Sequence, residues 1–354
     1  MKRLALLSLI GLTALVLSAC GTPTNVNWPG LAADAENVYL ANGNLVYAVR
    51  LSDGMKLWQY PEKSAGQVFY SNPVLAPDGQ MLIGSAGTDN GMVSLDPATG
   101  RENWTAPMVA NNHWVASPLV VGETIYAANN NGTLYAAELA TGYILWSLPL
   151  DNSLWSAPTS NGKLIFVTSL DHTLYAVDPE TRAVVWKTDL GGSAPGSATV
   201  SPDGNTVYVG SFGKKVFAFD ASSGAMQWTT DVQDWVWSAP VQDGDTLYAA
   251  DISGHIYSLG APDGKNAWLD LQPDGPITGS PLVTADGMVV ASESGSVFAY
   301  DRTGTKRWDA SLGGKFYTTP VAAGGSIVVA PMGGDFLVAA LSQDGKVLWK
   351  FTGK

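Results

Sequence analysis

The sequence predicts an all-β protein, an eight-bladed β-propeller made of four-stranded antiparallel blades. A tryptophan that follows a short glycine turn recurs every 40–46 residues, eight times in all. Short runs of β-branched and aromatic residues alternate with Gly, Asn and Asp turns, which is typical of strands in meander order. No stretch after Cys20 shows a sustained helical period. A repeat of this length with four strands is the size of a propeller blade.

The repeat over residues 117–146 shows how the four strands are assigned. Its sequence, SPLVVGETIYAANNNGTLYAAELATGYILW, contains the apolar runs PLVV, TIYAA, TLYAA and YILW in that order. Turn residues separate the runs, with Gly122 in the first turn, Gly132 in the second and Gly142 in the third. In this order, the second-to-third-strand turns and the loops that enter each inner strand lie on one face of the ring.

The tryptophans at the ends of the repeats are predicted to pack between neighbouring blades. A sheet cannot bury both of its faces alone, and an indole removes roughly 150–250 Å² from solvent. A glycine turn returns each indole at a fixed height, except in the fourth repeat, where Arg182 takes the glycine place and the turn can differ. The predicted docking residues are Trp58, Trp104, Trp146, Trp186, Trp228, Trp268, Trp308 and Trp349. The first repeat is complete from Trp28 to Trp58, so strand exchange between the chain ends is not demanded, and the mode of ring closure is left open.

The N-terminus carries the signs of an exported protein. Residues 1–3 form a basic n-region through Lys2 and Arg3, and the apolar run over 4–17 is too short for a membrane span. Leu-Ser-Ala-Cys at 17–20 resembles the lipobox of bacterial lipoproteins, which implies cleavage before Cys20 and acylation of its thiol; an ordinary secretory signal is the alternative. We therefore expect a lipoprotein signal peptide over 1–19, a lipid-anchored tether over 20–27 and a single propeller over 28–354.

The overall charge limits the possible partners. The formal net charge is −12 at pH 7, with 31 acidic and 19 basic residues. Such a chain is not expected to bind nucleic acid or an anionic membrane surface through charge. Contact with a membrane is expected only through the lipid anchor.

The closing segment of each repeat resembles the tryptophan-docking motif of the pyrroloquinoline quinone (PQQ) repeat family, Ala-x-Asp-x-x-x-Gly-x-x-x-Trp. Ala218, Asp220, Gly224 and Trp228 match it fully, and residues 94–104 match with serine in place of alanine. Other repeats depart from the motif at the aspartate, which is replaced by Arg50, Glu138, Gly260 and Ser342. The similarity covers essentially all residues after Asn27. It implies the PQQ-type propeller fold.

The resemblance is compatible with two different activities. Quinoprotein dehydrogenases of this family bind PQQ and a metal at the propeller mouth, beside a disulfide between adjacent cysteines. Other members are non-catalytic, including the lipoprotein of the outer-membrane barrel-assembly machinery. This chain has no cysteine after Cys20 and no evident equivalent of the dehydrogenases' calcium-ligand and catalytic segments. It therefore resembles the non-catalytic group more closely, and no cofactor is expected.

Aromatic residues gather just before several inner strands, on the face defined above. Four of them stand three residues before a proline, a shared register that indicates a common position. The candidate partner- or ligand-binding residues are Tyr70, Trp114, Trp155, Trp235, Trp237 and Tyr317. They form either a binding rim at the mouth of the central channel or structural plugs between the inner strands.

No catalytic or metal site is predicted. The three histidines, His113, His172 and His255, are not accompanied by cysteines or by a repeated carboxylate pattern. No nucleophile-elbow, zinc-protease, P-loop or EF-hand motif is present. Many aspartates fall in Asp-Gly turns, which turn geometry explains without catalysis.

The expected function is that of a membrane-anchored, extracytoplasmic lipoprotein that acts as a non-catalytic scaffold for protein interaction or assembly. It is expected to work as a monomer within a larger complex. It would lie on the periplasmic side of the outer membrane in a two-membrane envelope, or on the outer face of the plasma membrane otherwise. One alternative is a PQQ-binding oxidoreductase or sensor. A second is a surface protein that binds carbohydrate through its aromatic rim.

Overall fold

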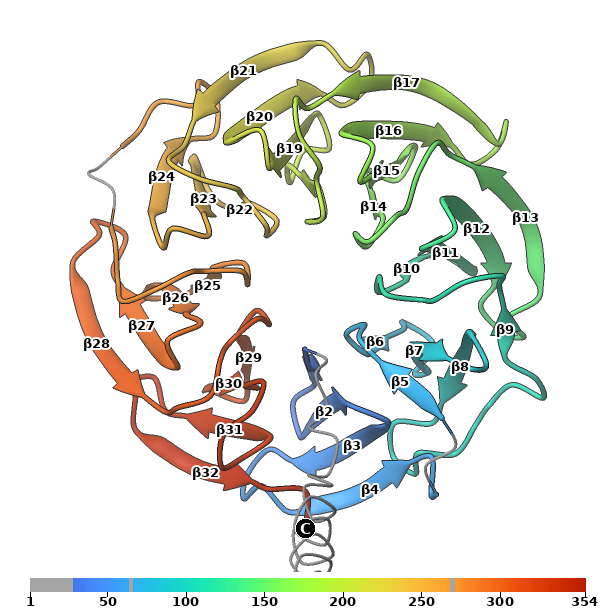
Figure 1. Ribbon diagram of the computed structural model, residues 1–354, viewed down its shortest axis with the longest axis vertical. Coiled ribbons are helices and arrows are strands. Elements are labelled where there is room, and N and C mark those ends of the chain that lie inside the picture. Colours follow the sequence, from blue (N-terminus) through green and yellow to red (C-terminus); the bar gives the residue numbers. More distant parts are fainter. Residues whose placement is uncertain (1–27, 64–65, 268–270) are drawn as a thin grey trace, which may run out of the picture.

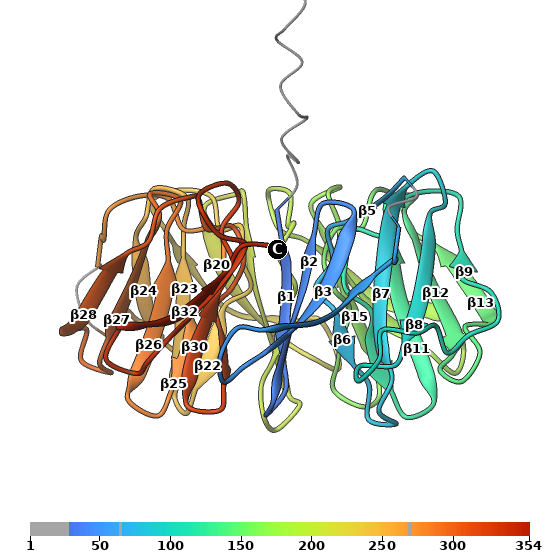
Figure 2. The same ribbon diagram turned by 90° about the horizontal axis from the view of Figure 1, so that it is seen from below.

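The computed structural model describes residues 28–63, 66–267 and 271–354, which form a ring of eight sheets around a central axis (Figure 1). Viewed from the side, the ring is a flat disc (Figure 2). Every assigned element in this part of the chain is a β-strand, as the sequence predicted. No helix long and apolar enough to cross a bilayer occurs among these residues. The predicted signal peptide, Cys20 and the tether lie outside the described residues.

Consecutive strands form each blade. Blades 1 to 4 comprise β1 (Gly30–Ala33), β2 (Asn37–Asn42), β3 (Leu45–Arg50), β4 (Lys56–Tyr60); β5 (Gln67–Phe69), β6 (Val74–Leu75), β7 (Met81–Gly87), β8 (Gly91–Leu95), β9 (Met108–Val109); β10 (Leu119–Val121), β11 (Thr124–Asn129), β12 (Thr133–Glu138), β13 (Ile144–Pro149); and β14 (Thr159–Ser160), β15 (Ile165–Thr168), β16 (Thr173–Asp178), β17 (Ala183–Asp189).

Blades 5 to 8 comprise β18 (Thr199–Val200), β19 (Thr206–Ser211), β20 (Lys215–Asp220), β21 (Met226–Asp231); β22 (Val241–Asp243), β23 (Thr246–Ala250), β24 (Ile256–Gly260); β25 (Leu282–Thr284), β26 (Gly287–Ala291), β27 (Ser296–Tyr300), β28 (Lys306–Ser311); and β29 (Val321–Ala323), β30 (Ser326–Val329), β31 (Val338–Leu341), β32 (Val347–Phe351).

Two blades differ from the four-stranded pattern. In blade 2, β5 and β6 both pair with β7, and the short β9 forms the outer edge. In blade 6, the assigned sheet contains β22, β23 and β24. Single bridges from Leu259 to Asn266 and from Ile256 to Leu271 continue the pairing on the outer side of β24. The predicted docking residue Trp268 falls outside the described part of the chain.

The middle strands of each blade form the core, as their apolar runs indicated. In β2, the residues from Val38 to Ala41 are all buried, whereas along β13 half-buried and exposed positions alternate. This contrast arises because a middle strand is covered on both faces by neighbouring blades, while an outer strand presents one side to water. The small residue at the end of the third strand pairs with the tryptophan of the fourth, as Ala136 does with Trp146, and a β-bulge follows the pair.

The tryptophans of the outer strands contact the next blade around the ring. The Trp58 indole N–H donates to the Pro97 carbonyl oxygen at 2.9 Å, and that of Trp104 donates to Leu139 at 3.0 Å. The same contact to the following blade is made by Trp186, Trp228, Trp308 and Trp349. The Trp146 ring lies 6.0 Å from that of Tyr126 within blade 3.

The turn glycine supports the indole of the preceding blade. Gly142 has φ of +71°, and a methyl group added there would lie 2.7 Å from Trp104 Cε3. Glycine thus provides both the left-handed turn and the space for the indole. In blade 4, Arg182 adopts φ of +58° and donates its N–H to the Asp178 carbonyl oxygen at 2.8 Å. The equivalent bond from Gly224 to Asp220 is also 2.8 Å, so arginine preserves the turn.

The eighth blade closes the ring directly onto the first. β1 to β4 and β29 to β32 are separate sheets, so no strand is exchanged between the first and last blades within residues 28–354 as described. The Trp349 indole N–H donates to the Leu51 carbonyl oxygen at 2.6 Å, and both side chains belong to one buried cluster. The blue and red ends of the chain meet at this seam (Figure 1).

Candidate binding site at the channel mouth

One position in each blade reaches the mouth of the central channel. In blade 4 this position is Trp155, four residues before Thr159, which pairs with Phe166 of the second strand. In every blade, the residue four positions before the corresponding inner-strand residue takes the same place. These eight residues are Trp28, Tyr70, Val115, Trp155, Pro195, Trp237, Thr278 and Tyr317. All eight residues line one cavity of about 240 Å³.

Small residues and backbone form the rest of this cavity. A methyl group on Gly30 would lie 2.1 Å from the Ser71 carbonyl oxygen, so adjacent inner strands approach too closely here for a larger side chain. Hydrogen bonds join neighbouring blades around the axis. The Asn72 N–H donates to Ser117 Oγ at 2.9 Å, and the Ser280 N–H donates to Thr319 Oγ1 at 2.8 Å. These contacts hold the mouth as a rigid ring.

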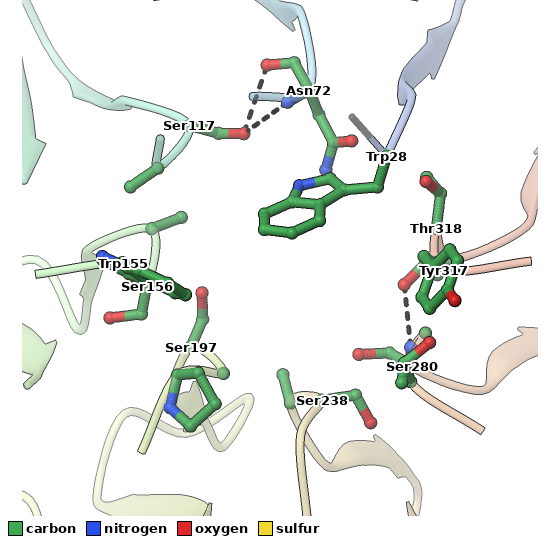
Figure 3. A pocket seen from close by; sticks show the side chains of 18 of the residues that line it. Trp28, Asn72, Ser117, Trp155, Ser156, Ser197, Ser238, Ser280, Tyr317 and Thr318 are labelled. Carbon is green, nitrogen blue, oxygen red and sulfur yellow. Dashed lines mark hydrogen bonds between the residues drawn. The ribbon is translucent and has the colours of Figure 1, made fainter. Parts of the chain in front are cut away.

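Figure 3 shows three of the aromatic side chains around the opening of this ring, those of Trp28, Trp155 and Tyr317. The Trp28 indole extends from the start of blade 1 toward the middle, with Trp155 and Tyr317 on other sides (Figure 3). Trp28 packs edge-on against Tyr70, with 5.4 Å between the ring centroids. The structure therefore brings together Tyr70, Trp155, Trp237 and Tyr317, and adds Trp28, which was not among the predicted rim residues.

Trp114 is a correction to the expected rim. Its side chain is fully buried, and its indole N–H donates to the Asn90 carbonyl oxygen at 2.9 Å. The cause is its position one residue before the mouth residue Val115. In blades 2 and 4 to 8 the corresponding place holds a buried apolar residue, namely Phe69, Leu154, Ala194, Val236, Ile277 and Phe316. Trp114 is therefore a packing residue between blades rather than part of the mouth.

Trp235 lies beside the mouth rather than within its central cavity. Its side chain is 43% exposed and stacks on Phe212, with ring centroids 4.7 Å apart. It borders a second hollow of about 320 Å³ between blades 6, 7 and 8. The residues that line this side hollow are Trp28, Trp235, Trp237, Ile252, Pro276, Thr278, Glu293 and Tyr317.

Glu293 is the one charged residue that borders either cavity among the described residues. It belongs to the turn between β26 and β27, which the blade topology places on the mouth face. Burial, and then the interaction of its hydroxyl with the Glu293 carboxylate, raise the pKa of Tyr317. Tyr317 therefore stays neutral across the physiological range and can donate a hydrogen bond.

The mouth does not fit PQQ. This quinone carries three carboxylates, and anions are held in proteins by Lys, Arg or a metal ion. Neither cavity is lined by a lysine or arginine in the described chain. Nor does this part of the chain hold a group of three or more His, Cys, Asp or Glu side chains placed to bind a metal. We therefore assign no redox step to the mouth.

The histidines are held by local contacts. His113 Nδ1 lies 2.8 Å from Asn90 Oδ1, and His255 Nδ1 lies 2.8 Å from Ser253 Oγ. His172 adopts φ of +75° in the turn between β15 and β16. The three side chains belong to different blades and do not form a common cluster in the structure.

The strand register, the tryptophan contacts and the closed ring define a β-propeller of the PQQ-repeat type, with an aromatic mouth that suits binding. Comparison with known proteins identifies the family. The sequence model described as outer membrane protein assembly factor BamB matches residues 16–188, 170–287 and 254–354. The chain belongs to this family, which confirms the resemblance drawn from the docking motifs.

Individual relatives are distant. The outer membrane protein assembly factor BamB of Nitrosomonas eutropha is 27% identical over 112 residues, covering 32% of this chain and 27% of the relative. The protein of the same name from Burkholderia pseudomallei is 27% identical over 118 residues, covering 32% and 29%. These alignments span less than a third of the relatives' length.

Solved structures share the fold. BamB from Moraxella catarrhalis superposes with a TM-score of 0.74 at 18% identity, covering 88% of this chain and 95% of that one. The computationally designed Ika8 protein gives a TM-score of 0.70 at 15% identity, covering 90% and 94%. At these identities the likeness establishes the propeller architecture alone.

Proposed function

We propose that this chain is a lipid-anchored assembly factor that binds protein partners during outer-membrane protein assembly and performs no catalysis itself. The observation that carries the proposal is the match of the BamB family model along almost the whole chain, from residue 16 to residue 354. The mouth supports a binding role because it combines aromatic rings with a rigid polar ring. It has no grouping of nucleophile, base and metal ligands among its described residues.

The anchor is part of this proposal. Residues 1–19 would be removed as a signal peptide, Cys20 would carry the acyl chains, and residues 20–27 would link the lipid to the propeller over 28–354. Two or more acyl chains anchor a protein stably where a single chain does not. The propeller would then lie as a monomer on the periplasmic side of the outer membrane, within a larger complex.

The outer strands offer further surface for partners. Tyr143 is 69% exposed, and Val185 and Leu348 are 52% and 54% exposed on β17 and β32. Such side chains favour association with another protein where they gather into a contiguous patch. A rigid ring with such edges and a separate mouth could engage more than one partner at once.

Depletion of the chain in its native cell tests the proposal. We expect the amount of folded outer-membrane protein to fall, as judged by heat-modifiable migration in gels. The variant Cys20→Ala should move from the membrane fraction to the soluble fraction and restore less folded protein. Normal levels of folded outer-membrane protein after depletion would contradict the assembly role.

The mouth aromatics either bind a partner or act as structural plugs. Trp155→Ala and Trp237→Ala separate the two roles, since both side chains are half-buried at the cavity. Intact folding with lost partner binding supports a binding mouth, whereas joint loss of both supports plugs. The carbohydrate alternative is tested by measuring binding of the unmodified chain to a panel of glycans.

A further inference from the structure

The side hollow between blades 6, 7 and 8 combines aromatic rings with a carboxylate. Trp235, Trp237 and Tyr317 contribute rings to its wall, and Glu293 contributes the charge. Phe212 packs against both tryptophans, at 4.7 Å from Trp235 and 5.3 Å from Trp237 between ring centroids. The rings are therefore held in place before any ligand arrives, which lowers the entropy lost on binding.

The basic side chains described near this hollow do not form an ion pair with Glu293. Glu293 takes part in no ion pair within the described residues. Lys214, in the turn beside Phe212, pairs instead with Asp234 at 3.2 Å. Lys315, two residues before Tyr317, does not line the hollow. A cation entering the hollow would thus meet an uncompensated carboxylate.

Aromatic faces carry partial negative charge and attract ammonium and guanidinium groups within about 6 Å of the ring centroid. A nearby carboxylate adds to this attraction and repels anions. From this chemistry we propose that the side hollow binds the cationic head of an arginine or lysine side chain on an extended segment of a protein partner. This assignment rests on the proposed function, because it takes the partner to be a protein.

The central cavity next to the hollow fits the backbone of such a segment. The two cavities share Trp28, Trp237, Thr278 and Tyr317, so a chain crossing the mouth can reach both. Ser238 lines the central cavity, is 6% exposed, and has a side-chain oxygen without a hydrogen-bond partner. A buried hydroxyl in this state gains free energy when a peptide N–H or C=O group approaches it.

Two short peptides that differ only in charge test the assignment on the full, acylated chain in detergent. The probes are acetyl-Ser-Arg-Ser amide and acetyl-Ser-citrulline-Ser amide, with citrulline as the uncharged isostere of arginine. Titration calorimetry should show saturable binding of the arginine peptide and at least tenfold weaker binding of the citrulline peptide. Higher salt should weaken the arginine complex, because ions screen the attraction to Glu293.

Variants locate the site on the protein. Glu293→Gln keeps the shape of the side chain and should weaken the arginine peptide at least fivefold, and Trp235→Ala should do the same. Glu123→Gln is the matched control, since Glu123 is exposed in the turn between β10 and β11 on the opposite face. Its affinity should equal that of the unmodified chain. Near-UV circular dichroism checks that each variant retains its packing.

Equal affinity for the two peptides, or no saturable binding of either, overturns the assignment without any variant. Unchanged affinity in a folded Glu293→Gln protein overturns it as well. If the peptides fail while depletion still lowers folded outer-membrane protein, the cation site is wrong and the assembly role stands. If depletion has no effect while the arginine peptide binds at Glu293, the assembly role fails and the site remains.

Discussion

Replacement of Gly142 by alanine tests how the blades are held together. Gly142 has φ of +71°, where an L-residue costs roughly 1–2 kcal/mol. The new methyl group would also lie 2.7 Å from Trp104 Cε3, and displacement of a packed side chain costs about 1–3 kcal/mol. We therefore expect Gly142→Ala to lower the free energy of unfolding by about 2–5 kcal/mol in total.

Gly122→Ala is the matched control in the same blade. Gly122 has φ of +59°, but a methyl group there would meet nothing within 4 Å. It should therefore cost only the backbone share, about 1–2 kcal/mol. Urea unfolding followed by far-UV circular dichroism measures both variants. Equal losses would show that the Trp104 indole does not rest on the turn glycine, and would refute the docking explanation.

Three further outcomes follow from particular contacts. Arg182→Gly should stabilise the protein by roughly 0.5–1 kcal/mol in the same urea assay, because it relieves a left-handed arginine; a loss of stability would mean that the arginine side chain contributes more than its backbone costs. Trp58→Phe should lower the free energy of unfolding by about 1–3 kcal/mol, because the Pro97 carbonyl loses its 2.9 Å donor and the smaller ring fills less of the space between blades; an unchanged free energy would show that the indole N–H is dispensable. Hydrogen bonds from Ser222 and Ser223 lower the pKa of Asp220 to about 2, below its usual 3.8. The carboxylate therefore stabilises the fold above about pH 4 and loses this effect as pH falls toward 2. The free energy of unfolding of the unmodified chain should exceed that of Asp220→Asn by less and less as the pH falls across that window. A difference that stays constant would contradict this role of Asp220.

Much of the fold could be predicted because its signals are local in sequence. The tryptophan, the small residue opposite it and the turn glycine fall within about eleven residues, and this short segment recurs along the chain. The altered turn at Arg182 was also visible, although the structure keeps the usual hydrogen bond there. Ring closure could not be predicted, because it depends on contacts such as Trp349 with Leu51, almost the whole chain apart.

The candidate site was harder to predict because one residue of offset changes the direction of a side chain. Trp114 stands four residues before its proline instead of three, and this small difference places it between blades. Trp28 was missed because blade 1 has Leu31 where most blades have the reference proline. Counting back from the paired residue of the second strand would have found it. The side hollow joins Trp235 and Glu293 from different blades, a proximity that spacing along the chain does not encode.

Photo-crosslinking in living cells tests the central claim most directly, namely that the mouth of the propeller is where a protein partner binds. A photoreactive amino acid replaces Trp235, in the side hollow of the mouth face, in one strain and Glu123 on the opposite face in another. We expect irradiation to join the mouth position, but not the opposite position, to a component of the outer-membrane assembly pathway. Equal adducts from both positions, or adducts from Glu123 alone, would contradict the claim.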